Sequence, residues 1–308
     1  MVNGPWVELE EPPPETPVID ALPAHGGLSW GRPPSNSSLN VGERHHMSFA
    51  NTGSQVQSVV PAPREQSGAA QRAAGLLGAV DRATEAFYSA VAELDTAAVR
   101  GPSLLPGWSR AHVITHVARN ADALVNLLTW AKTGVEHQAY TSRSDRDADI
   151  QEGSTRTLQL LRADLDSACL RFAAAAESTP ASAWEAEVSQ PSGGTVLAHQ
   201  VPWLRLRELL FHLVDLDVGI DFDSLPDEHV EDLLDGVVGQ FAGKPDVPAV
   251  RVEVTLPDGR QRVWELNTDG ADNAAVVSGE ASDVVGWLTG RHDGARLTGD
   301  KPKLPSWL

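Results

Sequence analysis

The sequence predicts an α+β protein, in which a four-helix bundle is followed by a small α/β domain with a mainly antiparallel sheet. Four long amphipathic helical patterns lie between residues 69 and 217. The pattern then changes to the strict alternation of 250-VRVEVT-255, followed by the turn 256-LPDGR-260, which is typical of a β-hairpin. Helices that come first and mixed elements that come later favour two successive domains.

The composition limits the kinds of partner. The formal net charge is −18, which argues against nucleic acid and against an anionic membrane surface. No apolar run is long enough to span a membrane. The single cysteine, Cys169, excludes an intrachain disulfide and favours the cytoplasm. We therefore expect a cytoplasmic protein, with a monomer as the simplest assembly, that acts on small molecules.

The first domain is preceded by a tail. Residues 1–68 are rich in Pro, Ser, Gly and Asn, and we expect them to be disordered. The first helix is predicted within residues 69–98, whose apolar stripe consists of Leu76, Leu77, Val80, Phe87, Val91 and Leu94. A Pro-Gly break follows, and Ser109 is a plausible N-cap for a second helix that runs from Arg110 to about Lys132.

The other two bundle helices follow a polar connection over residues 134–153. A third helix is predicted over about 149–178, and a fourth over about 199–217. Four amphipathic helices with one long connection fit a four-helix bundle over residues 69–222.

The second domain is predicted over residues 223–308. It begins with a linker helix at about 226–242, and the hairpin follows. The remaining elements are a third strand, a helix and a last short strand, predicted at 274–279, 281–291 and 294–300.

Two pairs of polar residues lie on the apolar helices. His112 and His116 on the second helix, and Glu208 and His212 on the fourth, each have i, i+4 spacing and point the same way. Two imidazoles and a carboxylate in a bundle core form a typical open zinc site. Spacing alone leaves other interpretations open. Glu208 and His212 also suit a helical ion pair, and either histidine of the second helix suits a hydrogen-bonded core residue.

Three segments add a resemblance: 105-LPGWSRAHVITHVARNAD-122, 140-YTSRSDRDADIQEG-153 and 203-WLRLRELLFHLVDL-216. Together they resemble the mycothiol-dependent maleylpyruvate isomerase family. The resemblance implies a DinB-like metal-binding bundle and a smaller α/β domain. It implies Zn²⁺, or another divalent metal, on His116, Glu208 and His212, with His112 as a neighbour.

The resemblance also implies an arginine from the second domain. Arg291 is the best match, and Arg262 and Arg296 are weaker candidates. We expect Arg291 to end its helix with a guanidinium that is free to reach the substrate across the seam between the domains. Tyr140 and Arg146 are candidates to bind the thiol cofactor at the mouth of the bundle, although the pattern itself somewhat favours an ordinary polar loop with salt bridges.

The implied reaction is the cis–trans isomerisation of maleylpyruvate to fumarylpyruvate, with mycothiol as the thiol cofactor. A zinc-bound thiol loses its proton. The thiolate adds to the double bond, the resulting single bond rotates, and elimination returns the thiol. One alternative is a mycothiol S-transferase that acts on another electrophile. Another is a non-catalytic metal-stabilised protein that binds a ligand, for which a closed shell with His112 as fourth ligand is expected.

Overall fold

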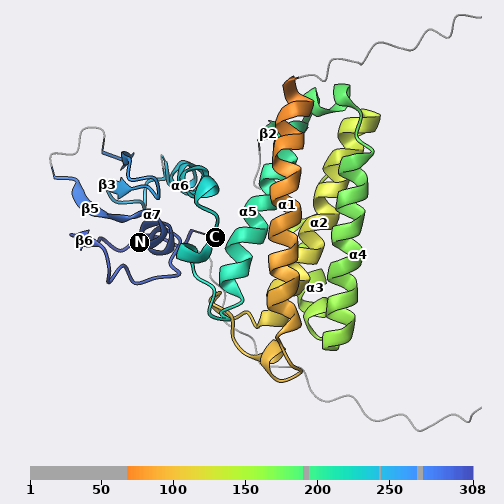
Figure 1. Cartoon of the computed structure of the whole chain (residues 1–308), viewed down its shortest axis with the longest axis horizontal. Helices are drawn as coiled ribbons and strands as arrows, with labels where there is room; N and C mark the ends of the chain where they lie inside the picture. The colour runs from red at the N-terminus through yellow and green to blue at the C-terminus, as the bar shows by residue number, and fades with distance from the viewer. Residues whose placement is uncertain (1–67, 190–193, 243, 269–272, 308) are drawn as a thin grey trace, which may run out of the picture. The chain divides into compact units, whose positions relative to one another are not determined.

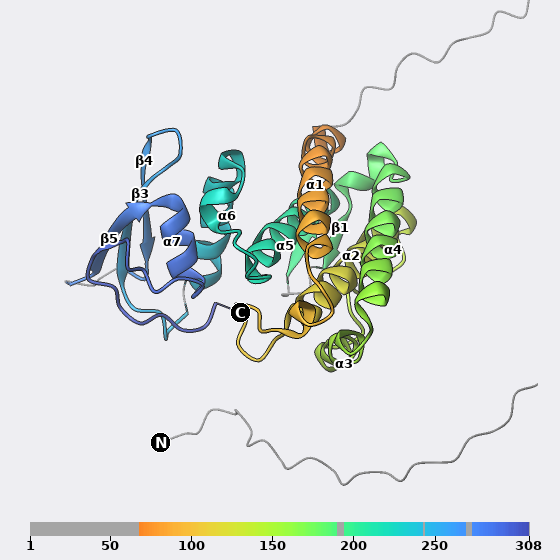
Figure 2. The same cartoon turned by 60° about the horizontal axis from the view of Figure 1, so that its bottom comes forward.

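The computed structural model describes residues 68–189, 194–242, 244–268 and 273–307 (Figure 1). The expected tail, residues 1–68, lies outside the described residues apart from Gly68. Four long helices form the bundle and lie side by side in both views (Figures 1 and 2). They are α1 (Gly68–Ala92), α2 (Arg110–Thr133), α4 (Leu158–Glu177) and α5 (Val201–Asp215).

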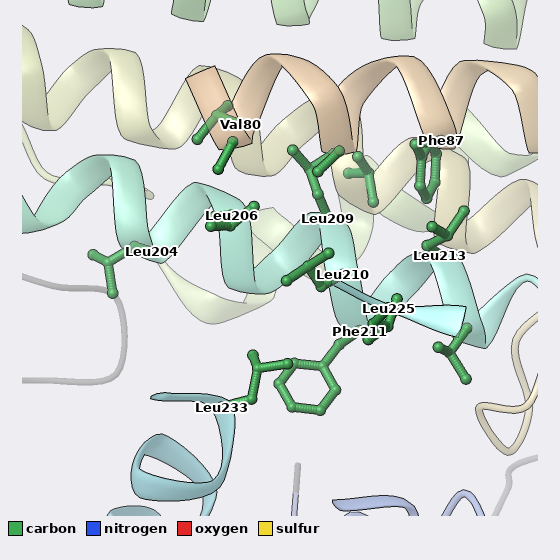
Figure 3. Packing of buried hydrophobic residues seen from close by; sticks show 14 of the residues in the cluster. Val80, Phe87, Leu204, Leu206, Leu209, Leu210, Phe211, Leu213, Leu225 and Leu233 are labelled. Carbon is green, nitrogen blue, oxygen red and sulfur yellow. The ribbon is translucent and has the colours of Figure 1, made fainter. Parts of the chain in front are cut away.

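Helix α5 is apolar on more than one face, because it is covered on more than one side. Figure 3 shows Leu206, Leu209 and Leu213 of α5 facing α1, while Phe211 points the other way, toward Leu233. A helix that is apolar all round is normally buried. Each fully buried leucine contributes about 1.5–3 kcal/mol relative to an exposed one. This packing explains the run of leucines around Glu208 and His212.

The predicted third helix, 149–178, is wrong, because the structure has two helices there. Helix α3 covers Arg143–Ser154, and α4 begins at Leu158. The side chain of Thr157 accepts a hydrogen bond from the backbone N–H of Leu160, an N-cap that starts a new helix. The guanidinium of Arg100 donates to the carbonyl oxygens of Ser154, Thr155 and Arg156, and so closes α3.

Gly153 allows α3 to lie against α2. A Cβ atom at this position would stand 2.5 Å from Cγ2 of Thr115. We expect Gly153→Val to lower the free energy of unfolding by about 1–3 kcal/mol, as overpacking typically does. Urea denaturation measures the change. The matched control is Gly236→Ala in a helix where an added Cβ meets nothing within 4 Å. A Gly153→Val protein as stable as the wild type would contradict this account.

Two short strands lie between α4 and α5 that the sequence did not predict. Strands β1 (Glu187–Ser189) and β2 (Thr195–Leu197) pair antiparallel. They follow a 3₁₀ turn, η2 (Ala181–Glu185), and precede another, η3 (Ala198–Gln200), that leads directly into α5. A third such turn, η1 (Ala98–Arg100), lies between α1 and α2.

The second domain has the predicted order of elements. Its described sheet has the order β4-β3-β5-β6, with β3–β4 and β5–β6 antiparallel and β3–β5 parallel. The elements are α6 (Asp227–Phe241), β3 (Val250–Thr255), β4 (Gln261–Leu266), β5 (Ala275–Glu280), α7 (Ala281–Leu288) and β6 (Thr298–Gly299), with η4 (Phe222–Ser224) before them. The α+β class and the mainly antiparallel sheet are therefore confirmed.

Helix α7 ends earlier than predicted, at Leu288 instead of Arg291. Gly290 takes a φ of 74°, a left-handed conformation that ends a helix and suits glycine. Arg291 consequently lies on the loop that follows α7. Among the described residues, none of the helices combines the length and apolarity that a membrane crossing requires.

Candidate metal centre

Helices α2 and α5 bring three potential metal ligands together. Nε2 of His116 lies 3.0 Å from Oε2 of Glu208, and Nε2 of His212 lies 3.4 Å from the same oxygen. One nitrogen or oxygen from each residue falls within 4.8 Å of the others. We call these three residues the triad. Both imidazoles therefore converge on one carboxylate oxygen, as ligands around one ion would.

The triad is buried but not sealed. The side chains of His116 and His212 are 5% and 4% exposed, whereas that of Glu208 is 21% exposed. The i, i+4 spacing on α5 stacks Glu208 and His212 on the side that faces α2. Oε1 of Glu208 lies 3.6 Å from Nη2 of Arg207, so the carboxylate has a further ion-pair partner beside the triad. Solvent reaches the triad along Glu208.

The electrostatics of the triad prepare it for a cation. Burial, together with the neighbouring His212, lowers the pKa of His116 to about 4, so His116 is neutral at pH 7. Burial alone would raise the pKa of Glu208, but hydrogen bonds from both histidines hold it well below its usual value. A neutral imidazole and an ionised carboxylate are the forms in which these groups bind metal.

Behind His212 lies a carboxylate that sequence reasoning missed. Asp215 is fully buried, and its Oδ2 lies 2.9 Å from Nδ1 of His212. Burial alone would raise the pKa of Asp215, but hydrogen bonds from His212 and Arg291 lower it instead. Burial alone would lower the pKa of His212, but its hydrogen bonds with Asp215 and Glu208 raise the pKa instead. The only sequence signal was its position three residues after a candidate ligand.

Arg291 is beside the triad, but its guanidinium is not free as expected. Its Nε and Nη2 each donate to a different oxygen of Asp215, both at 2.9 Å. The ring of Trp307 covers the guanidinium, with its centroid 5.2 Å away, and the Arg291 side chain is only 4% exposed. Arg291 therefore contacts the bundle through an ion pair with Asp215 of α5.

Two cavities lie next to Arg291. One has a volume of about 420 Å³ and is also lined by Asp221, Asp283 and Arg296. The other has a volume of about 520 Å³. Its lining includes Leu104, Pro106, Trp287, Lys301, Lys303 and Trp307. The triad residues do not line either of these cavities, but the loop that carries Leu104 continues to Trp108, whose ring packs edge-on against His116 at 5.6 Å.

Tyr140 and Arg146 lie at the triad. Nη2 of Arg146 is 3.2 Å from Nδ1 of His116, and its guanidinium carbon is 5.8 Å from the centre of the Tyr140 ring. Burial raises the pKa of Tyr140 to about 12, with Glu208 adding to the shift. Arg146 also pairs with Asp147 at 2.7 Å, as the salt-bridge interpretation expects. The start of α3 at Arg143 therefore places Arg146 beside His116, and Tyr140 lies against Arg146.

His112 lies outside the triad, because both of its ring nitrogens are engaged elsewhere. Its Nδ1 is 2.7 Å from Oγ of Ser109 in a capping box at the start of α2. Its Nε2 is 3.1 Å from Oγ of Ser154 and 3.2 Å from Gln151. A closed metal shell with His112 as fourth ligand does not fit this arrangement.

The two weaker arginine candidates point to other partners. Arg262 pairs with Glu231 and covers Trp264, with 4.4 Å to the ring centre. Arg296 pairs with Asp283 at 2.6 Å. Arg291 is therefore the arginine of these three that lies next to the triad.

The comparisons with known proteins match both parts of the chain. Residues 80–217 match the mycothiol maleylpyruvate isomerase N-terminal domain, and residues 224–306 match the MDMPI C-terminal domain. The crystal structure of a mycothiol-dependent maleylpyruvate isomerase is 29% identical, with a TM-score of 0.70 over 76% of this chain and 97% of that chain. The structure of a histidine-to-alanine mutant of such an isomerase is 28% identical, with the same TM-score and coverage. No curated protein matches the chain at a significant level. Two successive domain matches in one chain, together with the shared fold, show that it belongs to the mycothiol maleylpyruvate isomerase family of enzymes.

Proposed function

We propose that the protein is a cytoplasmic, zinc- and mycothiol-dependent enzyme that converts maleylpyruvate into fumarylpyruvate. The observation that carries the proposal is the triad, because it supplies three converging ligands, and no fourth joins them among the residues that the structure describes. The family supports mycothiol and this substrate, since the solved relatives are mycothiol-dependent maleylpyruvate isomerases. The single cysteine supports the compartment.

The donor set of the triad fits Zn²⁺. His116, Glu208 and His212 would hold the ion through two neutral imidazoles and one carboxylate. Bound zinc would supply a Lewis acid that keeps the thiol of the cofactor deprotonated and therefore nucleophilic. Burial of both histidines keeps water away from them, which strengthens any charge interaction at this place.

The other residues of the site have complementary tasks. Arg146 borders His116, with Tyr140 beside it, and both would bind an oxygen-rich part of mycothiol, such as its sugar or carboxylate. Arg291 borders both cavities and would attract the carboxylates of the substrate and the negative charge that develops on it. Mycothiol bound there would supply a thiolate whose reversible addition to the alkene allows the cis form to become trans, and Arg291 would stabilise the electron pair that the addition moves onto the substrate.

A mycothiol S-transferase is the second candidate, and the larger cavity favours it. Apolar side chains of Leu104, Pro106 and Trp287 share that cavity with Lys301 and Lys303. Such a lining suits an electrophile that is larger and more apolar than maleylpyruvate. The thiol then stays on the product instead of being released.

The amount of free mycothiol that the reaction consumes distinguishes an isomerase from a transferase. The zinc-loaded protein is incubated with mycothiol and maleylpyruvate, and separately with a panel of electrophiles. An isomerase forms fumarylpyruvate while the amount of free thiol stays constant. A transferase consumes one thiol for each product molecule. If zinc is bound and no thiol-dependent reaction occurs with any compound, both enzymatic proposals fail and the ligand-binding alternative stands.

A further inference from the structure

Asp215 joins two parts of the chain that the proposed mechanism uses separately. It is the last residue of α5, three residues after His212, and it has no exposed surface. Its Oδ2 faces Nδ1 of His212 at 2.9 Å. Its two oxygens also receive Nε and Nη2 of Arg291, which lies 76 residues further along the chain, both at 2.9 Å.

The contact with His212 decides which ring nitrogen can bind metal. A neutral imidazole carries one N–H, and the other nitrogen offers a lone pair. An ionised carboxylate only accepts, so Asp215 keeps the proton of His212 on Nδ1. Nε2 is then the free nitrogen, and it is the one that points to Glu208. Such outer carboxylates orient metal-binding histidines in other proteins and raise their basicity.

The contact with Arg291 keeps the carboxylate from turning. A guanidinium fork that meets both oxygens in parallel fixes the plane of the carboxylate. The ring of Trp307 lies 5.2 Å from the guanidinium and that of Phe211 lies 6.0 Å from it, so the arginine itself has little freedom. Neither charge can turn to water, because the Arg291 side chain is only 4% exposed and that of Asp215 is not exposed at all.

We propose that Asp215 is a positioning residue that couples the metal ligand His212 to Arg291. The carboxylate of Asp215 orients the imidazole of His212 toward the metal site, and it also holds the guanidinium of Arg291 in place next to the two cavities. By thermodynamic linkage, zinc binding by the triad stabilises the contact between Arg291 and Asp215, and that contact raises the affinity for zinc by the same factor. This inference rests on the proposed zinc site and adds a residue and a coupling to it.

The test is Asp215→Asn, measured with metal alone. An amide offers one acceptor oxygen and a donor NH₂, so it satisfies His212 or the arginine fork but not both. We expect Zn²⁺ affinity, measured by competition with a chelator, to fall about 10- to 100-fold. The absorption spectrum of the Co²⁺-loaded protein should change as well, since the His212 ring is no longer held.

Asp164→Asn is the matched control. Asp164 also accepts from two arginines, at 2.7 Å from Arg119 and 3.0 Å from Arg156, but it belongs to a separate ion-pair cluster on α4. We expect this variant to keep the wild-type Zn²⁺ affinity and Co²⁺ spectrum. The proposal is overturned if Asp215→Asn also keeps both, or if Asp164→Asn loses as much affinity.

A measurement on the wild type covers the case in which Asp215→Asn fails to fold. In the zinc-loaded protein with ¹⁵N-labelled histidine, His212 should carry its proton on Nδ1 and the metal on Nε2. Metal on Nδ1, or an Nδ1 without a proton, overturns the proposal. These tests need no mycothiol. If the wild-type protein binds zinc but does not catalyse the reaction, the proposed function is wrong, and the role of Asp215 is still decided by the zinc-affinity and NMR measurements. If the wild-type protein does not bind zinc, both proposals are wrong.

Discussion

Glu208→Ala is expected to remove zinc from the protein almost completely. Oε2 of Glu208 is the point on which both imidazoles converge, and its loss leaves two neutral ligands whose ring centres lie 4.5 Å apart. Zinc sites with four ligands have total affinities of about 10–16 kcal/mol, so one ligand is worth about 3 kcal/mol. The expected loss of affinity therefore exceeds about 100-fold.

His116→Ala and His212→Ala should behave in the same way, and metal content after dialysis against a weak chelator measures all three. His112→Ala is the control, because His112 completes the capping box of Ser109 at the start of α2 instead of joining the triad. It should retain zinc and lose about 0.5–2 kcal/mol of stability, as other lost caps do. Full zinc content in a triad variant would remove that residue from the site, and equal loss in His112→Ala would bring it in.

Arg291→Ala is expected to reduce both stability and turnover. It leaves the carboxylate of Asp215 fully buried with only His212 as a partner. Breaking a buried pair in this way costs about 3–5 kcal/mol of folding free energy. A lost charged contact to the transition state would cost a further 2–4 kcal/mol, roughly, in activation free energy. Urea denaturation and steady-state kinetics measure the two effects.

Arg291→Lys tests the fork itself, because lysine keeps the charge without the planar pair of donors. We expect turnover nearly as low as in Arg291→Ala, with a smaller loss of stability. The double variant Arg291→Met, Asp215→Leu removes both charges together. It should recover most of the lost stability, as buried pairs replaced by apolar residues often do, but no turnover. Near-normal turnover in Arg291→Ala would make the arginine structural and return attention to Arg262 and Arg296.

The sequence predicted those features that depend on local pattern. Apolar patterns placed α1, α2 and α5 to within a few residues at most ends, because each helix buries apolar side chains against its neighbours. The i, i+4 pair of Glu208 and His212 is likewise a local feature. The family resemblance then selected His116 over His112, which spacing alone could not do, since both histidines lie on the same side of α2.

The features that were missed depend on contacts between distant residues. The break between α3 and α4 did have local signals, since 151-QEGSTRT-157 contains no large apolar residue and Thr157 caps the next helix, but the hydrogen bonds from Arg100 that end α3 come from a distant segment. Asp215 looks like an ordinary acidic residue near a helix end. Its role appears only when Arg291 is placed against it, and no periodicity links residues so far apart in the sequence.

The burial of Asp215 has a consequence for the order of folding. The ribosome completes α5 well before it makes Arg291 and Trp307, which later pair with and cover this end of the helix. Domains generally fold as they emerge, the N-terminal one first. Until the second domain arrives, the new bundle has at one end a buried carboxylate without its arginine partner and an uncovered Phe211, where Trp307 will later pack at 4.6 Å. The nascent bundle should therefore stay loosely closed at that end, and the last step of folding would also be the step that assembles the site.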